Sequence, residues 1–91
     1  MQFDAFVREL QHIEQKYINE LATQQLVNTL EHDVQSLLDV ATCELTGCRS
    51  EVRASVVFGT DRTSLNLFFF YHDKQLTSLV ELWKVLETGR L

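Results

Sequence analysis

Histidine and cysteine side chains are the first candidates for chemistry in this chain, because both can bind metals and take part in catalysis. There are three histidines and two cysteines: His12, His32, His72, Cys43 and Cys48. Zinc sites are usually built from close pairs of such ligands. Here the cysteines form a single C-x4-C pair, and no two histidines are four residues apart. The spacing therefore predicts no metal site and two free thiols.

Two short runs place a histidine beside carboxylates, Glu31-His32-Asp33 and His72-Asp73. Consecutive residues of a helix point about 100° apart, so the first run cannot converge on one ligand. We expect His72 to end a strand and Asp73 to cap the helix that follows. The chain has neither a glycine-rich phosphate loop nor a nucleophile elbow. It is therefore predicted to be no enzyme and to use no cofactor.

The charge of the chain is acidic and unevenly spread. Eight lysines and arginines against thirteen aspartates and glutamates give a formal net charge of −5 over 91 residues. Residues 1–48 hold eight of the acids and two of the bases, so residues 49–91 are close to neutral. Nucleic-acid binding needs clustered lysine and arginine and is disfavoured. An acidic helical surface instead predicts a protein partner with a basic surface, contacted by Glu31, Asp33 and Asp39.

No segment of the sequence has the pattern of a membrane span or a secretion signal. A membrane helix needs about 18 consecutive apolar residues, and the chain has no such run. Its first residues include Asp4 and Glu9, where a signal peptide would have a basic start and an apolar stretch. We therefore expect a cytoplasmic, intracellular protein with a single domain over residues 1–91 and no membrane contact.

The first half of the chain has helical periodicity. Two series of apolar residues recur every three or four positions, as one face of a helix requires. They are Phe6, Leu10, Ile13, Tyr17 and Leu21, followed by Val27, Leu30, Val34, Leu37, Ala41 and Leu45. The phase slips between the series, so the helical region 1–46 forms either one bent helix or two antiparallel helices. One helix of forty residues would be about 60 Å long, so we favour two.

Strand periodicity follows the helical region. Residues 49–58 and 64–72 alternate with a period of two, which predicts an antiparallel β-hairpin over 49–72. The second of these strands is apolar on both faces, because Phe68 and Phe70 lie on the face opposite to its leucines. One face can pack on the helices, and the other has no obvious cover.

The last predicted element is a helix over 74–89, with Trp83 in the core and a cap at Asp73 or, one turn later, at Ser78. The fold class is therefore α+β with the order α-α-β-β-α, a two-stranded hairpin packed on helices. Two strands alone are marginally stable. Three arrangements stay open: the helices cover both faces, two copies share a larger sheet or core, or a partner adds a strand at an edge. We expect dimerisation to complete the fold, giving a homodimer.

These features predict a small acidic, non-enzymatic protein-interaction module that acts as an adaptor or inhibitor of a macromolecular partner. Besides the three acids, its candidate contacts are Phe68 and Phe70 as anchors, with Val57 and Arg53 beside them. In size and composition the chain is similar to dedicated secretion chaperones and to small inhibitor proteins of viruses and plasmids, which implies an origin in a virus or mobile element. No motif carries the similarity, so it assigns no residue a role. The alternatives are a secretion-chaperone-like binding protein and a small-ligand or metal-binding regulator.

Overall fold

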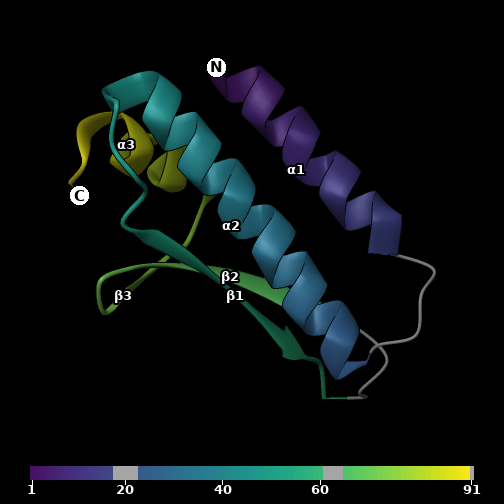
Figure 1. The fold of residues 1–91 in the computed structure, drawn as a ribbon. Coiled ribbons are helices and arrows are strands. Elements are labelled where there is room, and N and C mark those ends of the chain that lie inside the picture. The colour runs from purple at the N-terminus through teal and green to yellow at the C-terminus, as the bar shows by residue number, and fades with distance from the viewer. Residues whose placement is uncertain (18–22, 61–64, 91) are drawn as a thin grey trace.

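The computed structural model describes residues 1–17, 23–60 and 65–90. Its elements are α1 (Phe3–Tyr17), α2 (Gln24–Thr46), β1 (Val52–Phe58), β2 (Leu65–Tyr71), β3 (Lys74–Leu76) and α3 (Leu79–Thr88). The α+β class is confirmed, and the predicted order holds with one further strand before the last helix. α1 and α2 lie side by side and antiparallel (Figure 1), so the helical region is two helices. Part of the predicted break, at residue 22, lies outside the described residues.

The ends of α2 explain where this helix begins and stops. The Leu26 amide donates to Thr23 Oγ1 at 3.1 Å, which satisfies one of the free amides of the first turn. At the other end Gly47 adopts a left-handed conformation with φ 76°, and its amide donates to the Cys43 carbonyl at 2.8 Å. The chain then leaves the helix axis toward β1.

The sheet has three antiparallel strands in the order β1-β2-β3. The pairing of β1 with β2 runs from Val52 opposite Tyr71 to Phe58 opposite Leu65, so the two predicted strands are antiparallel neighbours. The third strand corrects the prediction of a two-stranded sheet. Leu76 pairs with Phe69 and is buried, so residues 74–76 are better placed in the sheet than in a helix.

The helix start predicted at Asp73 is wrong. His72 and Asp73 form a two-residue turn, in which His72 takes the left-handed φ of 54° and Tyr71 pairs with Lys74. The helix begins at Leu79, and the alternative cap is correct: the Glu81 amide donates to Ser78 Oγ at 3.1 Å.

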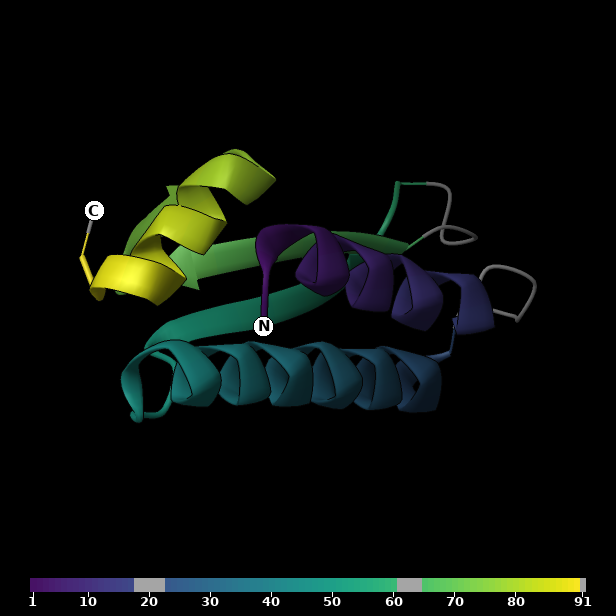
Figure 2. The same cartoon turned by 90° about the horizontal axis from the view of Figure 1, so that it is seen from above.

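All three helices lie on the same side of the sheet (Figures 1 and 2). The core fills the space between the two layers, and its fully buried side chains are Phe6, Val34, Leu38, Val52, Leu82 and Leu86. Trp83 is buried there as predicted, with its ring 5.3 Å from that of Phe6 and 5.8 Å from that of Phe3. The helices of the described residues therefore cover one face of the sheet, not both. None of these helices combines the length and the apolar composition needed to cross a membrane.

The capping assignment predicts different effects for two substitutions. Ser78→Ala removes the oxygen that accepts from Glu81, so we expect it to lower the free energy of unfolding by about 1 kcal/mol. Asp73→Ala changes an exposed turn residue and should stay within about 0.5 kcal/mol of the wild type. Urea denaturation followed by circular dichroism measures both, and a larger loss in Asp73→Ala would contradict the assigned helix start.

Candidate functional site

The face of the sheet that the helices leave uncovered carries the predicted aromatic anchors. Neighbouring residues of a strand point to opposite faces. In β1 the buried residues alternate with Arg53 and Val57, which therefore point away from the helices. In β2 Phe68 and Phe70 flank the buried Phe69 and share that outward direction. Four of the predicted contact residues thus lie on one surface.

We call this surface the open face, and the strand register defines its members: Arg53, Ser55, Val57, Asn66, Phe68, Phe70 and Gln75. Phe70 lies on the central strand between Arg53 on β1 and Gln75 on β3, and Phe68 lies opposite Ser55. The side chain of Val57 is 43% exposed, while Phe68 and Phe70 are half-buried. The open face therefore has an apolar centre, formed by two aromatic rings, among polar neighbours.

The three acids predicted to bind a basic partner lie on α2, and each accepts a hydrogen bond within the chain. Asp33 Oδ2 accepts from the Tyr17 hydroxyl at 2.7 Å and joins α1 to α2. Asp39 Oδ1 accepts from the Ser50 amide at 3.3 Å, and Glu31 Oε2 accepts from the Val56 amide at 2.9 Å. These carboxylates support the fold, so replacing them is expected to lower its stability whatever their effect on a partner.

The outer edge of β1 is covered by side chains of α2, an arrangement that sequence reasoning missed. Gln35 reproduces the pairing of a neighbouring strand: its Nε2 donates to the Val52 carbonyl at 3.0 Å, and its Oε1 accepts from the Ala54 amide at 2.9 Å. Glu31 takes the next outward amide, that of Val56. Glu31 and Gln35 are four residues apart, and this spacing places both on one face of α2. The spacing does not identify the strand backbone as their hydrogen-bond partner.

A hollow of about 400 Å³ lies beside this contact, between α2 and β1. Its lining residues are Asn28, Glu31, His32, Gln35, Arg53 and Ala54. Glu31 and Gln35 are already hydrogen-bonded to β1. Two of the six lining side chains therefore hold the sheet to α2.

The histidines and cysteines do not converge. The described residues contain no group of three histidine, cysteine, aspartate or glutamate side chains that could hold a metal ion. Cys43 and Cys48 are both exposed free thiols. Glu31 and Asp33 contact β1 and α1, so the Glu31-His32-Asp33 run forms no common site, as predicted.

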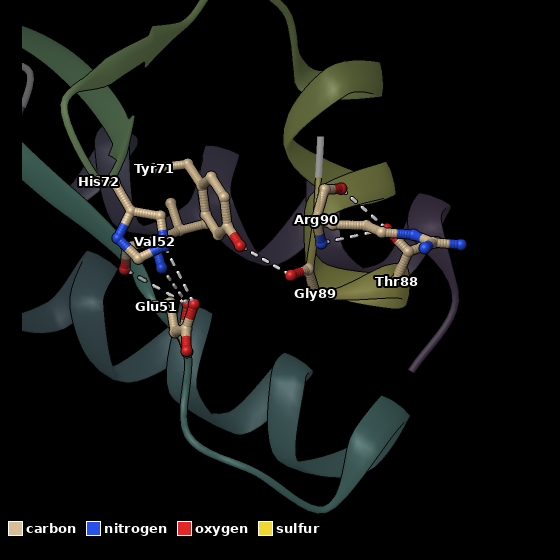
Figure 3. Close-up of polar contacts among 8 residues, drawn as sticks. Glu51, Val52, Tyr71, His72, Thr88, Gly89 and Arg90 are labelled. Atoms are coloured by element: carbon tan, nitrogen blue, oxygen red, sulfur yellow. Dashed lines mark hydrogen bonds and ion pairs between the residues drawn. The ribbon is translucent and has the colours of Figure 1, made fainter.

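His72 lies at the turn between β2 and β3, close to the end of α3 (Figure 3). Its Nε2 is 3.4 Å from Glu51 Oε2, and its ring contacts the ring of Tyr71 with 4.3 Å between the centroids. The Tyr71 hydroxyl donates to the Gly89 carbonyl at 2.7 Å and so ties the end of α3 to the sheet. The side chains of His72 and Glu51 are both more than 60% exposed, so their contact lies at the surface and encloses no site.

The covered edge of β1 predicts a cost for removing Gln35. Gln35→Ala leaves the Ala54 amide and the Val52 carbonyl without their partner, and we expect it to lower the free energy of unfolding by about 1–3 kcal/mol. Gln25→Ala is the matched control, because Gln25 lies on the same helix with an exposed side chain. Urea denaturation of both variants is the measurement, and equal stabilities would show that the edge contact is dispensable.

Comparison of the chain with protein-family models, with curated protein sequences and with solved structures gave no match. Its function therefore has to follow from its own surface. The feature that stands out on that surface is the open face, where an apolar centre lies on a sheet whose opposite face packs on the helices.

Proposed function

We propose that the chain is a small, acidic, non-enzymatic protein-interaction module, an adaptor or inhibitor, that docks its partner on the open face of the sheet. The supporting observation is that Phe68 and Phe70 lie on a sheet face that no helix of the described residues covers. Contiguous apolar side chains at a surface commonly mark interaction sites. Neither phenylalanine packs against the hydrophobic core, so burial inside the fold does not account for them.

The composition of the open face suits the centre of an interface. Aromatic residues and arginine are enriched where a few contacts carry most of the binding energy. Arg53 lies opposite Phe70 in the register and takes part in neither of the ion pairs found among the described residues. A partner with apolar side chains and one carboxylate placed at Arg53 would complement this pattern. The acidic helical layer lies on the other side of the sheet, where it can orient the encounter with a charged partner.

The size of the open face limits what it can do alone. β1 and β2, with seven residues each, span roughly 24 by 10 Å, and the three residues of β3 add roughly 10 by 5 Å, so the open face covers about 280 Å². A stable protein–protein interface buries about 800 Å² on each partner. A tight complex therefore needs contacts beyond the open face, on the sheet edge or the helices next to it.

A homodimer through the same face is the second candidate, because a second copy presents the same apolar centre. Two open faces packed together would bury only roughly 560 Å² in total, the range of weak contacts. Such a dimer would complete the sheet layer by placing it between two helical layers. In the first candidate the open face contacts a different protein, which affinity capture tests. In the second it contacts a second copy of this chain, which light scattering tests.

Affinity capture tests the interaction function with a pair of double variants. Phe68→Ser with Phe70→Ser should abolish capture of a partner from the organism that carries the gene, because the apolar anchors are lost. Val40→Ser with Val80→Ser is the matched control, since these valines are 50% and 70% exposed and lie on α2 and α3. Loss of the partner with both pairs, or with neither, would contradict docking on the open face.

Light scattering tests the homodimer. At tens of micromolar we expect a mass above that of the 10.6 kDa monomer if two open faces associate. The Phe68→Ser, Phe70→Ser variant should then return to the monomer mass. A wild-type chain that stays monomeric at this concentration would exclude the homodimer and leave the open face to a different protein.

A further inference from the structure

We infer that the exposed edge of β2, at residues 65–68, accepts an extended segment of a partner protein as an added strand in line with β3. This inference deepens the proposed function, because it states how the partner reaches beyond the open face. It rests on three observations: which backbone groups of β2 point outward, how the other edge of the sheet is closed, and how far the leucines of β2 are buried.

The hydrogen-bond pattern fixes which groups of β2 point outward. The amides of Ala54 and Val56 donate to α2, so they point away from β2. Phe69 and Leu67 are the register partners of Ala54 and Val56. Antiparallel pairs alternate between bonded and non-bonded positions, so the backbone amides and carbonyls of Phe69 and Leu67 must point away from β1. The same alternation turns the amide and carbonyl of Leu65 outward.

The third strand covers only part of this edge. β3 pairs with β2 from Phe69 to Tyr71, and no strand of the described residues pairs with residues 65–68 on the side away from β1. Four backbone groups, those of Leu65 and Leu67, are thus presented at an open sheet edge. Such an edge is a ready template for another strand.

The opposite edge of the sheet is occupied by side chains, which leaves β2 as the place for an added strand. Along β1 the outward amides of Val52, Ala54 and Val56 donate to Ser50, Gln35 and Glu31, and the Val52 carbonyl accepts from Gln35. An incoming strand would have to displace these side chains before it could pair with β1. At the 65–68 edge no side chain of residues 1–17, 23–60 or 65–90 is hydrogen-bonded to the outward groups of Leu65 and Leu67.

Burial along β2 also shows that β3 does not extend beside residues 65–68. Phe69, with Leu76 of β3 beside it, is only 9% exposed. Leu65 and Leu67 point to the same face toward the helices, yet both are only half-buried. A strand with an apolar residue at every second position would cover them, and its other side chains would lie next to Phe68 on the open face. The occupant is therefore an extended segment with alternating apolar residues.

A second copy fits this edge poorly. In each copy β3 already occupies the same edge from Phe69 onward. Two β2 strands could pair antiparallel over residues 65–68 only, because beyond that each would run against the β3 of the other. A free segment of a different protein carries no such strand and can follow the edge without this collision.

A peptide selection tests the inference with the full chain. Random twelve-residue peptides displayed on phage are selected on the immobilised wild type, and the selected peptides are then the probes. We expect them to have alternating apolar residues and to bind Leu67→Pro about tenfold or more weakly, because proline removes one outward donor. Leu67→Ala is the matched control: it loses the same leucine side chain, keeps the amide, and should bind within about threefold of the wild type. Proline is tolerated at edge positions whose amide faces solvent.

Amide hydrogen exchange on the wild type keeps the test independent of how the variants fold. A bound peptide should slow exchange at Leu65 and Leu67, whose amides pair with no strand of the described residues. Peptides that bind but leave these amides unprotected would overturn the inference, and so would a selection that yields no peptide. Protection that rises with protein concentration alone would overturn it in favour of a second copy. The proposed function is tested separately, by affinity capture with the Phe68→Ser, Phe70→Ser variant, whatever the outcome of the peptide experiment.

Discussion

The hydrogen bonds between Gln35 and the backbone of β1 are the contact on which the rest of the architecture depends. One side chain supplies a donor and an acceptor to Val52 and Ala54, so α2 takes the place of a fourth strand at this edge. That fixes the helical layer on one side and makes the three-stranded sheet viable although it is small. It also assigns the two faces of the sheet: one is committed to the core, and the other stays in contact with solvent.

Local patterns predicted the elements of this fold better than the contacts between them. Alternation in β1 and β2 identified the hairpin and placed Phe68 and Phe70 on one face, because the period of a strand is set by its own backbone. β3 was missed, since three residues are too few to show a period and a left-handed His72 is not a signal that sequence carries. Ser78 was recognisable as a cap because capping is local as well.

The candidate site divides in the same way. Phe68, Phe70, Val57 and Arg53 could be grouped from spacing alone, and the register confirms that they share one face. The acids could not be assigned from spacing, because their hydrogen-bond partners are 11 to 25 residues away in the sequence. An excess of negative charge on a helix indicates a solvated or partner-binding surface, whereas Glu31, Asp33 and Asp39 turn out to join elements of the fold. Replacing any of these three acids is therefore expected to change the stability of the fold as well as the charge of α2.

The sequence of β2 makes the chain prone to self-association before it has folded. The run Leu67-Phe68-Phe69-Phe70-Tyr71 is uncharged, rich in β-formers and free of proline, which is the composition of segments that assemble into cross-β fibrils. In the fold the middle of this run is paired on both sides, and the net charge of −5 keeps copies apart. During synthesis, before β1 and β3 have paired with it, the run has neither protection. The pairing of β1 and β3 with β2 is therefore what keeps this run from associating with other copies of the chain.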